Sequence, residues 1–490
     1  MKPQPICLSF VALAMLFACV SKSAIADEPK PNIVLILCDD LGIGDVQCFN
    51  PKLGKIRTPA IDALAKRGMS FTDAHSGSSV CTPTRYGMLT GRHSWRTKLQ
   101  SGVVAGFAPC LIAEDRPTIG SFLQGQGYRT GLVGKWHLNM KFMDPANKTV
   151  ELAADKYKST PPVGATSPDG PINRGFDFFY GIHHARSMEA VIEQDTVLQH
   201  KRPVTFLPSL ETKSIEFIKQ QADSKQPFFL YVPLGSPHTP IVPSKEWQGV
   251  SGISPYADFV MQTDHVVGNI LKCLDDQKLT ENTLVIFSSD NGCSRQAKIG
   301  QLEKIGHHVS AGFRGSKSDI WDGGHRVPFI ASWPNKIEPG SKCDQMICLL
   351  DMFATVGDCI DVKVPEDSCE DSVSFFSALK GEPIESPREG LIHHSISGHF
   401  AYRTKQWKLI LARGSGGWSS PKENQVSKNA PKGQLYRMDS DAKEQTNLYQ
   451  DQPDVVADLL KKLKRDITSG RTTEGIPSSN DVKIKLWKSK

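Results

Sequence analysis

The sequence predicts an α/β protein with a large, mainly parallel β-sheet covered by helices on both faces, followed by a small antiparallel sheet with a helix. First, strand-like apolar runs alternate with helical patterns along most of the chain, which is typical of parallel sheets with crossover helices. Second, 490 residues, of which 39% are apolar and 22% charged, suffice for one large domain and a smaller one. Third, short strand-like segments replace this alternation after about residue 383.

The large domain is predicted to span residues 27–383. Five apolar runs are predicted as its strands, at 33–37, 129–133, 228–232, 284–287 and 327–332. Segments with apolar residues at helical spacing are predicted as helices, at 59–67, 118–126, 214–221 and 256–275. Gly68 ends the first of these helices. Residues 144–173 are polar and rich in Pro, Gly and Ser, so they are predicted to form a surface insertion.

The C-terminal subdomain is predicted to span residues 384–490. Short antiparallel strands are expected at 391–395, 400–403, 407–412 and 434–438, and an amphipathic helix at 453–464. Residues 414–432 lack any periodic pattern and are predicted to form a mobile loop.

The first 26 residues have the three parts of a signal peptide. Lys2 supplies positive charge, residues 6–20 form a short apolar run, and Ala24-Ile25-Ala26 provides a small-residue cleavage site. An alternative is a lipoprotein signal in which Cys19 is lipidated. The apolar run is too short for a good membrane span, and no later segment has a transmembrane pattern. The sequence therefore predicts export, to the periplasm or by secretion.

The chain has 12 cysteines. An exported protein can pair some of them, and Cys343 with Cys348 or Cys359 with Cys369 would close short loops. The connectivity itself cannot be read from the sequence.

The motif with the clearest chemistry is Cys81-Thr82-Pro83-Thr84-Arg85. Pro83 suits the first turn of a helix, where its missing N–H costs little. The helix would place the thiol of Cys81 at its N-terminus, with Arg85 one turn later on the same face. Helix N-termini attract anions, and an arginine adds a bidentate oxyanion clamp. These residues predict a reactive group beside an anion site.

Polar residues follow the ends of several predicted strands, where ligands bind in open α/β sheets. Four of them, Asp39, Asp40, Asp290 and Asn291, form an all-oxygen set. Hard cations such as Ca²⁺ or Mg²⁺ prefer such ligands, whereas zinc prefers His and Cys. The sequence therefore predicts a hard-cation site at this edge of the sheet.

A set of cationic and titratable side chains accompanies these acids. Its members are Arg85, Lys135, His137, His238 and Lys317. The net charge is only +6 and no block of Lys and Arg occurs, which argues against a nucleic-acid partner and suits an anionic substrate through weak electrostatic steering.

The motifs together resemble those of the type I sulfatases, in the alkaline phosphatase superfamily. Cys81-Thr82-Pro83-Thr84-Arg85 matches their C-x-P-x-R signature. Residues 314–328 resemble their R-G-x-K…(E/D)-G-G-x-R-x-P segment, with Ser316 where glycine is common and Asp322 where glutamate is common. The resemblance runs in order from Pro31 to about Pro334, and more loosely to Tyr436.

This resemblance implies a mechanism and its partners. Cys81 would be oxidised to Cα-formylglycine by a formylglycine-generating enzyme, and the hydrate of the aldehyde would attack sulfur. Ca²⁺, rather than Mg²⁺, would be held by Asp39, Asp40, Asp290, Asn291 and residue 81. Arg85, Lys135 and Lys317 would hold sulfate oxygens, His238 with Lys317 would protonate the leaving alcohol, and His137 would help to expel sulfate. The implied substrate is a sulfated carbohydrate or an aryl sulfate.

Substrate selection is less determined. Candidate rim residues are His183, His184, Arg186, His307, His308 and His325. Two other functions stay open from sequence: a phosphate or phosphonate monoester hydrolase of the same superfamily, and a non-catalytic binder of sulfated glycans. A structural surface protein would leave the paired motifs at the strand ends unexplained.

Overall fold

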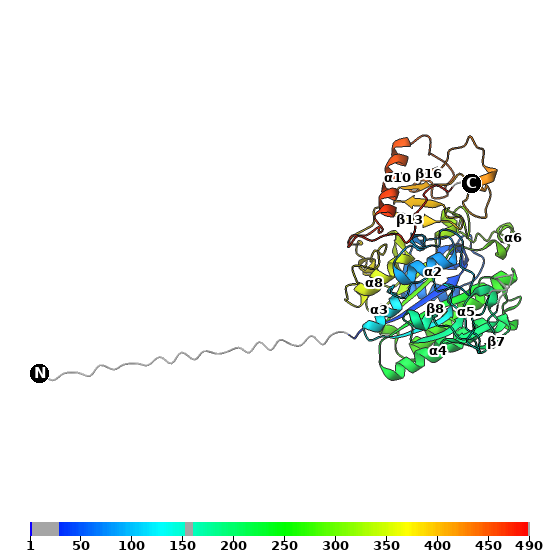
Figure 1. Ribbon diagram of the computed structural model, residues 1–490, viewed down its shortest axis with the longest axis vertical. Helices are drawn as coiled ribbons and strands as arrows, with labels where there is room; N and C mark the ends of the chain where they lie inside the picture. Colours follow the sequence, from blue (N-terminus) through cyan, green and yellow to red (C-terminus); the bar gives the residue numbers. More distant parts are fainter. Residues whose placement is uncertain (2–28, 152–159, 489–490) are drawn as a thin grey trace.

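The computed structural model describes residue 1, residues 29–151 and residues 160–488 (Figure 1). The predicted signal peptide and the alternative lipidation site at Cys19 lie outside this range, apart from residue 1. None of the helices in the described part of the chain is long and apolar enough to cross a membrane.

The described residues form a ten-stranded sheet in the order β11-β2-β10-β9-β1-β8-β4-β5-β6-β7. The central strands β9, β1, β8, β4 and β5 are mutually parallel, which confirms the mainly parallel sheet. Their bounds are β1 Asn32–Asp39, β4 Arg129–Lys135, β5 Phe178–Ile182, β8 Phe228–Pro237 and β9 Thr283–Ser289.

The outer strands were only partly predicted. β10 (Phe329–Ser332) occurs as expected but runs antiparallel to β9. The sequence interpretation missed the short or partly exposed strands β2 Met69–Phe71, β6 Ala190–Glu193, β7 Thr196–His200 and β11 Ser341–Cys343, as well as β5. A separate two-stranded sheet joins β3 (Ala74–His75) to β12 (Ile347–Cys348).

Helices cover both faces of the large sheet, as the alternating apolar runs predict. The side chains of Ile33, Leu35 and Leu37 pack in one core with α2 (Cys81–Thr90), α3 (Ile119–Gly125) and α8 (Met352–Cys359). Those of Val34, Ile36 and Cys38 pack in the other with α1 (Pro59–Arg67), α4 (Phe206–Ser224) and α5 (Pro255–Asp276). Shorter helices are α6 Ile299–Lys304, α7 Asp322–His325 and α9 Phe376–Leu379.

The predicted small sheet is present at the end of the molecule opposite α4 (Figure 1). Its antiparallel strands are β13 Leu391–His394, β14 Phe400–Arg403, β15 Trp407–Ile410 and β16 Gln434–Arg437. The helix α10 (Pro453–Thr468) packs against it through Val456, Leu459 and Leu463. The loop 414–432 is irregular as expected, but its first part is held: the N–H of Ile320 donates to the carbonyl of Ser415 at 2.8 Å.

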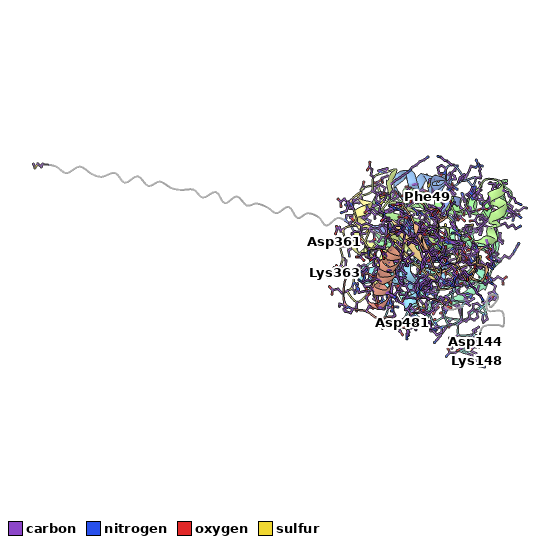
Figure 2. The ribbon with its side chains drawn as sticks, turned by 90° about the horizontal axis from the view of Figure 1, so that it is seen from above. Phe49, Asp144, Lys148, Asp361, Lys363 and Asp481 are labelled. Atoms are coloured by element: carbon purple, nitrogen blue, oxygen red, sulfur yellow. The ribbon has the colours of Figure 1, made fainter. Side chains whose placement is uncertain are left out.

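The predicted insertion at 144–173 lies partly on the surface and partly in the core. Asp144 and Lys148 lie at the edge of the molecule (Figure 2). Ala165 and Ser167, by contrast, are buried, because the N–H of Thr166 and the carbonyl of Met143 join this segment to the body at 2.9 Å. Residues 152–159 lie outside the described range.

The two suggested disulfides do not form, because all four cysteines are free thiols. Cys343 lies on β11 in the large sheet, whereas Cys348 lies on β12 in the two-stranded sheet. Cys359 and Cys369 are each buried in the apolar core.

Candidate active site

Four neighbouring parallel strands bring the predicted site residues to one edge of the sheet. Asp39 ends β1 and Asp40 follows it, Lys135 ends β4, His238 follows β8, and Asp290 follows β9. Because β9, β1, β8 and β4 are adjacent and parallel, their carboxyl ends meet, as the sequence predicts.

The helix α2 supplies Cys81 as its first residue and Arg85 one turn later. Every residue of this helix is buried, with Cys81 2% exposed. Arg85 donates from Nε and Nη2 to Asp290 Oδ2 at 3.0 and 2.7 Å, and from Nη1 to the carbonyl of Lys135 at 3.1 Å. The arginine therefore ties the helix to the ends of β9 and β4. Burial raises the pKa of the Cys81 thiol, so an unmodified Cys81 is neutral at pH 7.

The acidic residues are cross-linked by the two lysines. Lys135 Nζ lies 2.5 Å from Asp39 Oδ2, and Lys317 Nζ donates to Asp40 Oδ1. Asn291 Nδ2 donates to the same Asp40 oxygen at 2.8 Å. Two buried oxygens, Asp39 Oδ1 and Asn291 Oδ1, have no hydrogen-bond partner among the described residues. Buried acceptors without partners are rare, and a bound ion or an ordered water is what commonly satisfies them.

The carboxylates differ in their electrostatics. Burial disfavours the charge of Asp39, but Lys135 and His238 outweigh it and hold the pKa of that carboxyl well below its usual range. Burial and the neighbouring Asp39 carboxylate raise the pKa of Asp290 to about 7. The Asp39 carboxylate is therefore ionised at pH 7, whereas ionisation of Asp290 beside it is energetically unfavourable.

Three residues at the site have left-handed backbone conformations. The φ angles are +67° at Asp40, +57° at His137 and +82° at Ser318, the residue after Lys317. Such angles are uncommon for residues other than glycine and gather at functional sites. The backbone therefore turns sharply at Asp40, at His137 and directly after Lys317.

The two predicted site histidines follow different strands, His137 after β4 and His238 after β8. His238 Nε2 lies 3.6 Å from Asp40 Oδ2, and its Nδ1 lies 2.5 Å from the carbonyl of Thr239. His137 Nε2 lies 3.0 Å from the carbonyl of Val104, while its Nδ1 has no partner among the described residues. Burial lowers the pKa of both, to about 4 for His238, so both imidazoles are neutral at pH 7.

The candidate rim residues divide into two groups. The prediction is wrong for His183, His307 and His325, which are at most 1% exposed. His183 packs against Phe107 and Phe142, and His307 lies 2.8 Å from Asp45 Oδ1. These contacts join segments that are distant in the sequence, so the sequence does not reveal them. The His184 ring meets the ring of the site residue His137 edge-on, with centroids 4.4 Å apart. Of the remaining two candidates, Arg186 is exposed and His308 is half-buried.

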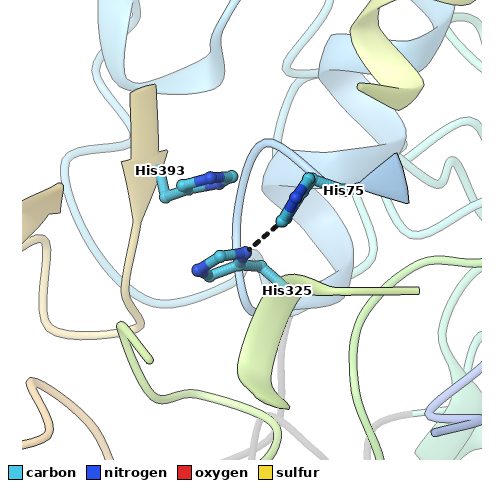
Figure 3. Close-up of side chains that lie close together, drawn as sticks. All are labelled: His75, His325 and His393. Atoms are coloured by element: carbon cyan, nitrogen blue, oxygen red, sulfur yellow. Dashed lines mark hydrogen bonds between the residues drawn. The ribbon is translucent and has the colours of Figure 1, made fainter. Parts of the chain in front are cut away.

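His325 instead joins His75 and His393 in a buried cluster from α7, β3 and β13 (Figure 3). Lys408 Nζ lies 3.1 Å from His325 Nε2, the two Nδ1 atoms of His325 and His75 lie 3.1 Å apart, and His75 Nε2 lies 2.8 Å from Asp73 Oδ1. Because an ammonium group only donates, the proton positions follow along the chain. Lys408 donates to His325, His325 to His75, and His75 to Asp73.

The packing of the rings argues against a metal at this cluster. The His325 and His393 rings stack 3.6 Å apart at 13°, whereas two imidazoles on one tetrahedral zinc have centroids about 5 Å apart, given Zn–N distances of about 2.0–2.1 Å. The cluster therefore joins the two-stranded sheet, through His75 on β3, to the small four-stranded sheet, through His393 on β13. Its member His75 lies six residues before Cys81 along the chain, so the cluster supports the segment that leads to the site.

The cluster makes stability depend on pH. Burial lowers the pKa of His75 to about 4 and those of His325 and His393 well below their usual range, while unfolded histidine titrates near about 6.5. The unfolded state therefore binds more protons below pH 6.5, and stability falls as the pH drops. We expect a loss of up to about 1.4 kcal/mol per pH unit for each histidine between about pH 6.5 and 4. Urea unfolding at pH 7.5 and 5.5 measures it.

A His393→Asn variant provides the comparison, because asparagine does not titrate. Its unfolding free energy should depend less steeply on pH than that of the wild type. An unchanged slope would mean that His393 does not stay neutral in the folded state.

Comparisons with known proteins agree with this geometry. A family model described as Sulfatase matches residues 31–362, and one described as N-sulphoglucosamine sulphohydrolase, C-terminal, matches residues 316–473. The chain is 29% identical over 501 residues to N-acetylgalactosamine-6-O-sulfatase of Bacteroides thetaiotaomicron, covering 92% of this chain and 96% of that protein. It is 28% identical over 473 residues to steryl-sulfatase of Homo sapiens, covering 82% and 79%.

A solved structure supports the same assignment. A protein of a Bacteroides thetaiotaomicron locus for the metabolism of multiple glycosaminoglycans superposes with a TM-score of 0.77 and 26% identity, covering 89% of this chain and 99% of that chain. The Sulfatase model alone covers more than half of the chain. The protein therefore belongs to the type I sulfatase family of the alkaline phosphatase superfamily and is a sulfuric ester hydrolase.

Proposed function

We propose that this hydrolase removes sulfate from sulfated carbohydrates, with residue 81 as the nucleophile after conversion of Cys81 to formylglycine. The observation that carries the proposal is the convergence of Cys81, two buried lysines and an oxygen-rich acidic group at one edge of the sheet. The similarity to a protein named N-acetylgalactosamine-6-O-sulfatase favours a sugar sulfate as substrate.

The acidic group fits a calcium ion. Asp39 Oδ1 and Asn291 Oδ1 are buried acceptors without partners in the described structure, and Asp39, Cys81 and Asp290 each place one ligand atom within 4.8 Å of the others. Ca²⁺ accepts such flexible oxygen sets, whereas Mg²⁺ demands near-ideal octahedral geometry. Asp39, Asp40, Asp290, Asn291 and residue 81 would hold the ion, which would supply positive charge to polarise the sulfate group.

Formylglycine supplies what the thiol lacks. The hydrate of the aldehyde has two hydroxyl groups: one would attack sulfur, and loss of the proton of the other would re-form the aldehyde and release sulfate. A thiol has no second hydroxyl group and could not release sulfate in this way. Asp290, held by Arg85, is the proposed acceptor of the proton of the attacking hydroxyl. The unpartnered Nδ1 of His137 is proposed to help deprotonate the second hydroxyl.

The two lysines stabilise the charge of the sulfate. Burial opposes the charge of Lys317, but Asp40 and its neighbours raise the pKa of Lys317 above its usual range, so the ammonium persists beside the leaving group. Neutral His238 has its Nε2 free to accept a proton, because its Nδ1 is engaged by the Thr239 carbonyl. We assign donation of the proton to the leaving alcohol to the Lys317 ammonium, and His238 would act as an acid only after its Nε2 has taken up a proton. Lys135 and Lys317 would hold sulfate oxygens, with Arg85 orienting Asp290.

The predicted signal peptide and the modification of Cys81 together suggest an order of export and maturation. We propose export to the periplasm or medium after a formylglycine-generating enzyme has modified Cys81. The protein should therefore be produced with such an enzyme before it is assayed.

The test of function is release of free sulfate from a panel of sulfated sugars. We expect release from sulfated galactosamine or related sugars by the matured protein, and the preferred position identifies the substrate. The proposal fails if a preparation with formylglycine at residue 81 releases sulfate from aryl sulfates but from no sulfated carbohydrate.

Removal of calcium should destabilise the protein. An ion that binds only the folded state contributes about 2.7 kcal/mol at 100 times its Kd, so we expect chelation to lower the unfolding temperature and added Ca²⁺ to restore it. An Asp39→Asn variant should lose this response, whereas Asp439→Asn, at an exposed residue outside the site, should keep it. Equal unfolding temperatures with and without bound calcium would contradict the assignment.

A further inference from the structure

The side chains of the proposed site are all buried, and those of His238 and Lys317 are the most exposed among them. Cys81, Arg85 and Lys135 are at most 2% exposed, while Lys317 is 4% and His238 9% exposed. The proposed function places the leaving alcohol beside Lys317 and His238, so the alcohol part of the substrate would lie on their side of the site. Side chains that flank Lys317 are placed to contact that part of the substrate.

Two loops from distant parts of the chain flank Lys317. The N–H of Lys317 donates to the carbonyl of Cys293 at 2.9 Å, in the segment that follows Asn291. The N–H of Trp418, in the loop of the small subdomain, donates to Ser318 Oγ and Asp319 Oδ1, each at 2.9 Å. Both loops are thus fixed to the segment that carries Lys317.

These loops place an arginine and a tryptophan against each other. The guanidinium of Arg295 lies 4.7 Å from the ring centroid of Trp418. Arg295 is exposed and Trp418 is half-buried, and no carboxylate in residues 29–151 or 160–488 forms a salt bridge with Arg295. By contrast, Arg437, which lies over Trp407, also pairs with Asp439 at 3.1 Å.

We propose that Trp418 and Arg295 form a carbohydrate subsite for an anionic sugar next to the sulfate ester. The indole would pack against the C–H face of a sugar ring, and the guanidinium would bind an oxyanion on that or the adjoining sugar. This inference rests on the proposed function and narrows the substrate to polyanionic glycans. The oxyanion is a uronate carboxylate or a second sulfate.

Binding affinity tests the subsite without requiring turnover. In a Cys81→Ala background, Kd is measured for a sulfated disaccharide with a uronate, the same sugar with its carboxylate reduced to an alcohol, and a disulfated analogue. Arg295→Gln should weaken binding of the preferred anionic sugar about tenfold, a typical effect of one charged hydrogen bond, and leave the reduced sugar little changed. Trp418→Ala should weaken all three, and Trp418→Phe should restore part of the affinity.

Arg437→Gln is the matched control, because it removes an arginine from another half-buried tryptophan, Trp407, which has no contact with the loops bonded to the Lys317 segment among those described above. The proposal is overturned if Arg295→Gln and Trp418→Ala change Kd no more than this control does. Sulfate release by the matured wild type is measured separately. Loss of affinity without sulfate release would support the subsite and reject the proposed function, whereas release without loss of affinity would do the reverse.

Discussion

A Cys81→Ala variant should lose roughly ten-thousandfold or more of the sulfate-ester turnover of the matured protein, the scale seen when a nucleophile is removed. Cys81 is the first residue of the buried helix α2. Its sulfur lies within 4.8 Å of a carboxylate oxygen of Asp39 and of one of Asp290. Alanine removes the nucleophile without enlarging the side chain. Initial rates of sulfate release, with circular dichroism to check folding, measure the effect.

The matched control is Cys110→Ala. Cys110 is also a buried thiol with a raised pKa, but it lies in the apolar core and is not grouped with Asp39 and Asp290 as Cys81 is. It should cost stability and leave turnover of the folded fraction close to that of the wild type. Turnover by Cys81→Ala within tenfold of the wild type would exclude residue 81 as the nucleophile.

Lys408→Met should destabilise the protein by about 3–5 kcal/mol, the usual cost of breaking a buried ion pair on one side. Lys408 is fully buried, and its Nζ lies 2.7 Å from both Asp322 Oδ1 and Glu444 Oε1. The methionine fills most of the volume but leaves Glu444 without its cation and His325 without its donor. Equilibrium unfolding in urea measures the change.

Lys462→Met provides the control for that variant. Lys462 forms an i,i+4 pair with Asp458 on α10, with side chains 33% and 56% exposed, and such pairs contribute less than about 1 kcal/mol. If Lys408→Met lowers the unfolding free energy no more than Lys462→Met does, the buried lysine does not stabilise the contact between the two-stranded sheet and the small four-stranded sheet.

Much of the site follows from local signals in the sequence. The apolar run at 33–37 and the acids after it predict both β1 and its position at the edge, because parallel strands end together. The helix at 59–67 has the bounds of α1, since Pro59 and Gly68 mark its ends. Cys81 and Arg85 share a face because they are one turn apart.

The parts that sequence did not reveal depend on contacts between distant segments. His325 has the pattern of a rim residue but is covered by β13 and Lys408, 83 residues later. Trp418 lies in a loop without periodicity, and its place beside Lys317 comes from a hydrogen bond across 100 residues. β6 and β7 form an edge hairpin with several exposed side chains, so no buried apolar run marked them.

The most direct test of the central claim compares turnover of an aryl sulfate with that of the matching aryl phosphate, on protein whose residue 81 has been identified by peptide mass. A sulfatase that uses the residue 81 hydrate should release sulfate much faster than phosphate, and only in preparations that contain formylglycine. Faster phosphate release, or sulfate release that does not scale with the formylglycine content, would contradict it.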